Sequence, residues 1–344
     1  MLYTGRSLLA LLFFSLTGHC ALVAAKITKD EQKAFDRLVK AVIKEGGYVH
    51  PSIGILSPAP SGAPRGIGMV ENVKPKIESG KDMLMKVPYS YQMTRDLAMS
   101  TLMDVIPPMV LVDAPLLELD DSALLVLLLA HEYGLGKNSK FHAYTEFLPS
   151  WQDEGGGCGY ENVQDFRQLP AGIEPEEIEM ALQYATHVSL GMYGDYGEYL
   201  ANDAWPREWK DEPALALRWA MCVVSSRATA ANRRAGDNNS GTGVRLIPLV
   251  DLANHRKASS GFVELSGSER IVYDDFMDAT SDDTGSFVVR SAWKCGTTRV
   301  DLEKGDEITV NYNLPAYQAV DWFLSLGFLP AELSSNTMKT NDEL

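Results

Sequence analysis

Four short stretches of this 344-residue sequence carry groups that could bind a ligand or orient a reactant. The turn Gly66-Ile67-Gly68 would let the backbone approach a bulky ligand closely, although an ordinary turn would use the same glycines. Arg227 lies in a mostly apolar stretch where an unpaired guanidinium is unfavourable, so it needs a carboxylate from a ligand or from the chain itself. The pair Asn254-His255 follows an apolar, strand-like run, and Tyr312 ends another.

Better-known catalytic motifs fail at specific positions. His131-Glu132 is not a zinc-protease helix, because Leu135 stands where the second histidine is required. The Gly66-Ile67-Gly68 turn lacks the third glycine of a dinucleotide fingerprint and leads into a strand-like run. No P-loop and no Gly-x-Ser-x-Gly elbow occurs in the sequence. The histidines beyond the first 25 residues show no ligand spacing, so we expect no catalytic metal.

The elements that must position these residues follow from hydrophobic periodicity, caps and the placement of glycine and proline. Helices are predicted over 29–45, 121–133, 175–202 and 213–234, and strands over 67–73, 83–87, 244–252, 261–265, 286–292 and 307–312. The helix 121–133 is apolar nearly all round, so it should be buried, and it is too short to span a membrane. Because strands flank a long helical insert at about 90–243, we predict one α+β domain over 26–330.

Five patches occur in a fixed order along the chain. They are Arg65 to Gly68, Ser139 to Pro149 with Tyr144 at its centre, Trp219 to Arg227, Leu246 to His255, and Gly305 to Tyr312 followed by Leu324 to Phe328. In this order they resemble the SET-domain protein methyltransferases, most closely the branch typified by the Rubisco large-subunit methyltransferase and its actin-histidine-modifying relative. The resemblance spans roughly Gly46 to Pro330 and implies a SET-type β fold of several small sheets, with a pseudoknot near the C-terminus and a long helical insert.

The resemblance also implies S-adenosylmethionine as the cofactor. The glycines Gly66 and Gly68 would lie against it, and Arg227 would bind its methionine carboxylate, with an internal ion pair as the other interpretation of Arg227. The side chain of Asn254 and the adjoining backbone would hold the amino group and adenine of the cofactor.

Three further residues receive roles from the same resemblance. Tyr312 matches the catalytic tyrosine, although a tyrosine in a strand usually serves core packing. The ring of His255 is counted with the cofactor site as a positioning element rather than a base. Asp251 is counted there too, with an architectural role favoured over a catalytic one.

The implied activity is S-adenosylmethionine-dependent N-methylation of a protein, on lysine rather than histidine. The resemblance is incomplete at two points: Asn313 stands where the family commonly has glycine, and the C-terminal helical substrate-binding domain of many members has no counterpart after Pro330. The alternative is therefore a SET-like protein-binding module of the secretory pathway that has lost catalysis.

The two ends of the chain predict its cellular location. Residues 1–25 read as a signal peptide, with Arg6 before the apolar run Leu8 to Leu16 and small residues before Lys26; an uncleaved anchor is the alternative. In the tail 331–344, the terminal Asn341-Asp342-Glu343-Leu344 resembles an endoplasmic-reticulum retention signal. With an N-glycosylation sequon at Asn238, these features predict the endoplasmic reticulum lumen, with a plastid reached through the secretory pathway as the alternative.

Charge and cysteine content limit the partners. The sequence holds 31 Lys and Arg against 46 Asp and Glu, a formal charge of -15, which repels phosphate backbones and argues against a nucleic-acid partner. A protein substrate with a basic segment fits this charge, and we expect a monomer without stable membrane insertion after signal cleavage. Loss of Cys20 with the signal leaves Cys158, Cys222 and Cys295, so at most one disulfide can form within the chain.

Overall fold

The computed structural model describes residues 27–61, 63, 65–71, 83–149, 169–170, 172–232, 242–257, 263–264, 285–290, 302–312, 314, 316–330 and 333. The predicted signal peptide, the sequon at Asn238, Cys158, Cys295 and the terminal tetrapeptide lie outside the described residues. All seven residues predicted for the site lie within them. Among the described residues, no helix combines the length and the apolar character needed to cross a bilayer.

The strands of the described residues form four small sheets. One sheet has the order β1 (Tyr48–Val49), β4 (Met83–Val87), β9 (Phe287–Arg290), β8 (Val263–Glu264), and three two-stranded sheets pair β2 (Ile53–Leu56) with β3 (Gly66–Met69), β5 (Thr229–Asn232) with β6 (Thr242–Arg245), and β7 (Asn254–His255) with β10 (Thr309–Val310). Only the β7–β10 pair is parallel among these; every other pairing is antiparallel.

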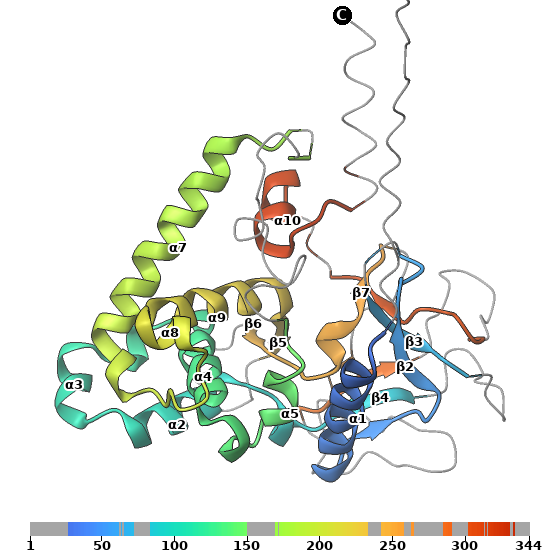
Figure 1. The fold of residues 1–344 in the computed structure, drawn as a ribbon, viewed down its shortest axis with the longest axis horizontal. Helices are drawn as coiled ribbons and strands as arrows, with labels where there is room; N and C mark the ends of the chain where they lie inside the picture. The colour runs from blue at the N-terminus through green and yellow to red at the C-terminus, as the bar shows by residue number, and fades with distance from the viewer. Residues whose placement is uncertain are drawn as a thin grey trace, which may run out of the picture.

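Most helices gather on one side of the molecule, whereas the N-terminal helix (blue) lies on the other side with most of the small sheets (Figure 1). Between β4 and β5 the chain forms α2 (Arg95–Val105), α3 (Pro108–Asp113), α4 (Asp121–Leu135), α5 (His142–Thr145), α7 (Pro175–Tyr196), α8 (Arg207–Asp211) and α9 (Ala214–Arg227). Short 3-10 turns lie at η1 (Tyr89–Tyr91), η2 (Leu116–Glu118), η3 (Gly136–Asn138), η5 (Gly197–Tyr199) and η6 (Val250–Leu252). Towards the C-terminal end, α10 (Ala319–Leu326) packs against α7 and α9.

The predicted buried helix is confirmed as α4. The side chain of Asp120 caps it by accepting a 2.7 Å hydrogen bond from the Ala123 N–H, and Asp121 adds negative charge to its first turn. All residues from Leu124 to Ala130 are buried, because α2 and α9 pack against this helix and other parts of the core close round it. One large hydrophobic cluster joins α4 to α1, β4, α9 and the run Leu246–Ala253.

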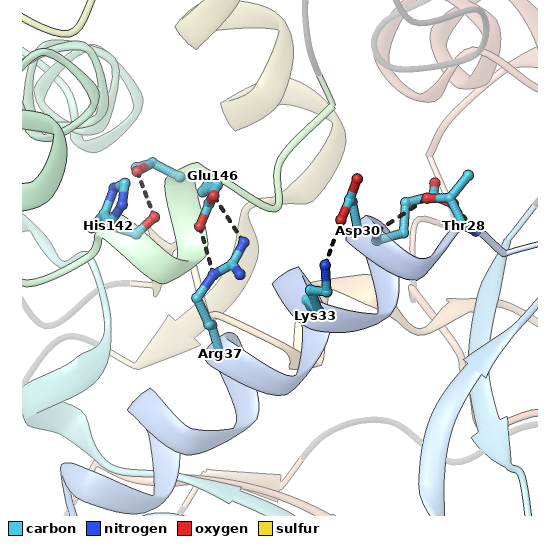
Figure 2. Close-up of polar contacts among 8 residues, drawn as sticks. Thr28, Asp30, Lys33, Arg37, His142 and Glu146 are labelled. Carbon is cyan, nitrogen blue, oxygen red and sulfur yellow. Dashed lines mark hydrogen bonds and ion pairs between the residues drawn. The ribbon is translucent and has the colours of Figure 1, made fainter.

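Helix α1 (Lys29–Lys44) confirms the predicted N-terminal helix and is tied to the segment after α5 (Figure 2). A capping box between Thr28 and Glu31 begins it, and Phe35, Leu38 and Val42 are buried along one face. On its outer face the Arg37 guanidinium forms two hydrogen bonds of 2.9 and 2.8 Å with the carboxylate of Glu146.

Several boundary predictions are wrong, and two of them have a clear structural reason. The helix predicted over 213–234 ends at Arg227, because residues 229–232 pair with 242–245 as strand β5. The strand predicted over 244–252 ends at Arg245, because Pro248 cannot donate to a ladder and Leu249 has a φ of 74°. Of the other predictions, strand 83–87 has the observed bounds of β4, and helix 175–202 is shorter, ending at Tyr196.

Candidate functional site

The predicted site residues Arg227 and Tyr312 converge on the turn from Asp251 to Asn254. The Arg227 guanidinium, at the end of α9, donates from Nη1 to the backbone carbonyl of Asp251 at 3.2 Å. The Tyr312 hydroxyl donates to the carbonyl of Ala253 at 3.0 Å. Two side chains that are 85 positions apart in the sequence therefore donate hydrogen bonds to carbonyls of the same turn.

The sequence around this turn explains its conformation. Leu246, Ile247, Leu249 and Val250 are completely buried, which anchors the run in the core and lets the polar residues after it face the site. Leu249 has φ 74° and ψ −42°, close to a classic γ-turn, and such a conformation is strained for a residue with a side chain. The strain persists because burial on both sides of Leu249 holds the backbone.

The parallel pairing of β7 with β10 brings Tyr312 to the turn. Asn254 is paired with Thr309 and His255 with Val310, so the chain carries Tyr312 just past the end of the ladder. The backbone N–H of Tyr312 donates to Nδ1 of His255 at 3.2 Å. An imidazole that accepts at Nδ1 carries its proton on Nε2 when it is neutral, so this contact fixes the tautomer of a neutral His255. The positioning role of its ring stays a prediction.

An aromatic cluster covers this end of the site. The His255 ring lies 5.1 Å from the Tyr312 ring and 4.9 Å from the Trp322 ring, measured between centroids. Tyr312 and Trp322 are nearly parallel, at 11° and 6.3 Å. Trp322 comes from α10, which the sequence analysis did not predict as a helix, although its amphipathic pattern and the glycine at Gly327 would have indicated one.

Glu307 is a second residue that sequence reasoning missed. Its Oε1 accepts a 2.7 Å hydrogen bond from Nδ2 of Asn254, and its two oxygens accept from the N–H (2.6 Å) and the hydroxyl (2.9 Å) of Ser61. Asn254 Nδ2 also donates to the carbonyl of Arg65 at 2.8 Å. With both amide hydrogens used, the side-chain oxygen of Asn254 has a fixed direction. Glu307 lies in the sequence patch from Gly305 to Tyr312, so its place in that patch could have indicated a role at the site.

The glycines Gly66 and Gly68 face another part of the chain. A Cβ at Gly66 would lie 2.6 Å from Oε1 of Glu307 and 2.8 Å from Nδ2 of Asn254, and one at Gly68 would collide with the carbonyl of Asp306. The two segments are also joined by backbone hydrogen bonds, including Ile308 N–H to the Ile67 carbonyl at 2.8 Å. The close approach that these glycines permit is therefore an approach between segments 66–69 and 305–308.

The electrostatics of the site depend on burial. Burial raises the pKa of Asp251 to about 6, although the positive charge of Arg227 and a hydrogen bond from Tyr144 act to lower it. Burial also raises the pKa of Tyr312 to about 12, so its side chain is a neutral phenol at neutral pH. Among the described residues, no carboxylate forms an ion pair with Arg227, and Oδ1 of Asp251 is buried without a hydrogen-bond partner.

This arrangement provides a cation, a buried carboxylate, an oriented amide and a neutral phenol within one region. In the part of the chain that the structure describes, no three His, Cys, Asp or Glu side chains are grouped so as to hold a metal ion. The arrangement can bind a polar ligand that carries both a carboxylate and hydrogen-bond donors, and can orient a donor group beside Tyr312.

No protein-family model matches the chain, and no curated protein matches its sequence. Solved structures do match, among them the crystal structure of the SET domain of LSMT bound to lysine and AdoHcy, with a TM-score of 0.55 at 14% sequence identity. The match covers 86% of this chain and 57% of that one, so the chain spans little more than half of that protein's length. At this identity the likeness shows the fold: helices with several small sheets, of SET type. The pseudoknot and the helical insert stay predictions.

Proposed function

We propose that this protein is an S-adenosylmethionine-dependent protein methyltransferase that acts on lysine, in the branch of the SET family typified by the Rubisco large-subunit methyltransferase. The observation that carries the proposal is the convergence of Arg227 and Tyr312 on the turn Asp251–Asn254. The SET domain that shares this fold is bound to lysine and AdoHcy. AdoHcy is the product that remains when S-adenosylmethionine has given up its methyl group, which supports both the cofactor and the acceptor.

The unpaired polar groups of the site fit the amino-acid end of this cofactor. Arg227 has no carboxylate partner among the described residues and would bind the cofactor's carboxylate. The buried, unpartnered Oδ1 of Asp251 and the oriented oxygen of Asn254 are acceptors suited to its ammonium group. Gly66 and Gly68 would contribute indirectly: because they lack a side chain, segment 305–308 can approach closely enough for Glu307 to hydrogen-bond Asn254. When bound, the cofactor supplies an electrophilic methyl group on a sulfonium.

Tyr312 would orient the acceptor amine. Because its hydroxyl hydrogen is donated to Ala253, the hydroxyl oxygen remains to accept a hydrogen bond from an amine N–H. Its pKa of about 12 makes it an orienting group rather than a base at neutral pH. Neutralising a lysine at pH 7 requires about 4.6 kcal/mol in water, from its reference pKa near 10.4. The aromatic rings of His255 and Trp322 beside Tyr312 would reduce this requirement by excluding water from the amine, because lower hydration disfavours its charged form.

One observation favours the alternative of a SET-like binding module without catalysis. The space beside Gly66 and both amide hydrogens of Asn254 are taken by the chain itself, through Glu307 and Arg65. In such a module these contacts would close the cofactor site permanently. In the enzyme they would order it.

Calorimetric titration of the purified protein with S-adenosylmethionine separates the two functions. We expect the folded protein to bind the cofactor and Arg227→Ala to lose most of the affinity, because a hydrogen-bonded charge pair would be removed. Arg37→Ala is the matched control, since Arg37 binds Glu146 on the outer face of α1. A folded wild-type protein that does not bind would exclude the enzyme and support the binding module.

We further propose the lumen of the endoplasmic reticulum as the location, with residues 1–25 as signal, 26–330 as the SET-like domain and 331–344 as the tail. Cys222 is disulfide-bonded, which suits an oxidising compartment. Deleting Asn341–Leu344 should send the protein into the medium, as measured by immunoblotting of cells and medium. Retention of the truncated protein in the lumen would reject the tail as the address, and delivery to a plastid would support the alternative route.

A further inference from the structure

Tyr144 is completely buried and has no part in the proposed chemistry, yet it contacts the turn on which the site is built. Its hydroxyl donates a 2.5 Å hydrogen bond to Oδ2 of Asp251, a residue 107 positions away. The carbonyl of Asp251 accepts a hydrogen bond from Arg227, and the carbonyl of Ala253 accepts one from Tyr312. The hydrogen bond from Tyr144 therefore holds Asp251, the first residue of the turn that accepts the hydrogen bonds of Arg227 and Tyr312.

The position of Tyr144 is itself fixed by buried polar contacts. The Ser139 hydroxyl donates to Oε2 of Glu132 on α4 at 2.5 Å and accepts from the Phe141 N–H at 2.8 Å. The Tyr144 N–H then donates to the Phe141 carbonyl at 2.9 Å, which starts α5. Helix α5 packs against both α1 and α4. The hydroxyl is thus presented to Asp251 from a rigid support.

A role in packing alone does not explain this pair. A buried carboxylate is unfavourable unless it is fully hydrogen-bonded, and Oδ1 of Asp251 has no partner among the described residues. The groups that face Asp251 are Tyr144 from α5, Arg227 from α9 and Tyr312 from beyond β10. An apolar pair of the same size would avoid this unfavourable burial, so the carboxylate and its donor suit a site better than a core.

We propose that Tyr144 is a positioning residue of the candidate site: by holding the Asp251 carboxylate, it fixes the turn 251–254 in the conformation that receives Arg227 and Tyr312. Its effect on cofactor binding rests on the proposed function. Its effect on the protonation of Asp251 does not, because that is a property of the protein without ligand.

The test compares Tyr144→Phe with Tyr91→Phe. Tyr91 is a matched control, because it is equally buried, stacks on Phe141 at 5.2 Å, and its hydroxyl has no hydrogen-bond partner among the described residues. We expect Tyr144→Phe to weaken S-adenosylmethionine binding about tenfold, the loss of one hydrogen bond to a charged group, and Tyr91→Phe to leave it within about twofold. Equal affinity of folded Tyr144→Phe and wild type, or equal losses in both variants, would overturn the proposal.

A second measurement keeps the test decisive if the wild-type protein does not bind the cofactor. The Tyr144 hydrogen bond lowers the pKa of Asp251, so removing it should raise that pKa further. The pH dependence of the melting temperature, measured without ligand, should then move to higher pH in Tyr144→Phe and stay in place in Tyr91→Phe. An unmoved profile would overturn the proposal. If Tyr144→Phe does not fold, Asp251→Asn replaces it and should abolish the titration that the wild type shows.

Discussion

The side-chain amide of Asn254 donates a 2.7 Å hydrogen bond to Oε1 of Glu307, directly beside the α-carbon of Gly66. The same carboxylate holds the N–H and the hydroxyl of Ser61. Glu307 thus contacts both Ser61, which precedes β3, and Asn254, the first residue of β7. This contact makes the glycine at position 66 a structural requirement whether or not a cofactor lies nearby.

Gly66→Ala should destabilise the protein by about 1–3 kcal/mol, because the added methyl would overlap the Glu307 and Asn254 side chains. Gly191→Ala is its control: Gly191 lies in α7 with nothing within 4 Å of an added Cβ. That change should stabilise by about 0.5–1 kcal/mol, since alanine favours helix. Urea denaturation measures both, and equal effects of the two changes would contradict the crowding at Gly66.

Under the proposed function, Tyr312→Phe should lower methyl transfer at least about tenfold while leaving cofactor affinity nearly unchanged, because it removes the hydroxyl proposed to orient the amine and keeps the ring. Transfer of a labelled methyl group to a protein extract of the secretory pathway measures the first quantity, and calorimetry the second. Tyr317→Phe is the control, since the rings of Tyr317 and Trp322 form a T-shaped pair that loss of the Tyr317 hydroxyl leaves in place. Unchanged transfer by Tyr312→Phe would remove this hydroxyl from the mechanism.

Asp251 should make stability fall as pH rises from about 4 to about 6. Its pKa is raised from 3.8 to about 6 in the folded protein, so across this window the folded state holds a proton that the unfolded state has released. The loss is at most about 3 kcal/mol, from a shift of about two pKa units. Melting curves against pH for wild type and Asp251→Asn isolate it as a difference. Parallel profiles would show that Asp251 does not titrate in this range.

The ion pair between Arg37 and Glu146 should contribute less than about 1 kcal/mol despite its two-pronged geometry, because its side chains are 47% and 38% exposed. A double-mutant cycle with Arg37→Ala and Glu146→Ala measures the coupling by urea denaturation. The coupling should shrink further at about 1 M salt, where charges are screened within a few ångströms. A larger coupling that does not depend on salt would show that this ion pair contributes substantially to the docking of α1.

The elements predicted best from the sequence are those whose formation depends on a local residue pattern. The apolar run after Asp121 and the strand Met83–Val87 follow from periodicity and composition, and both have the expected character. The end of α9 did not follow, because the pairing of Thr229 with Arg245 overrides the helical pattern that continues past Arg227. A tertiary contact of this kind leaves no mark within either segment.

The site shows the same division. The five ordered patches located Arg227, Asn254 and Tyr312, and the structure brings these together. The partners that hold them, Glu307 and Tyr144, lie within the patches but received no role. Their function depends on which distant residue each one meets, and residue type and local spacing do not contain that information.

The contact between Ser61 and Glu307 joins residues 246 positions apart. During synthesis the N-terminal partner leaves the ribosome long before the C-terminal one, so the turn at Gly66 and the strand at Asn254 emerge without the carboxylate that orders them. The nascent chain can form α1 and α4 from local contacts, but this site is completed only near the end of translation. Chaperones would therefore meet a chain in which local helices can form while the candidate site is still incomplete.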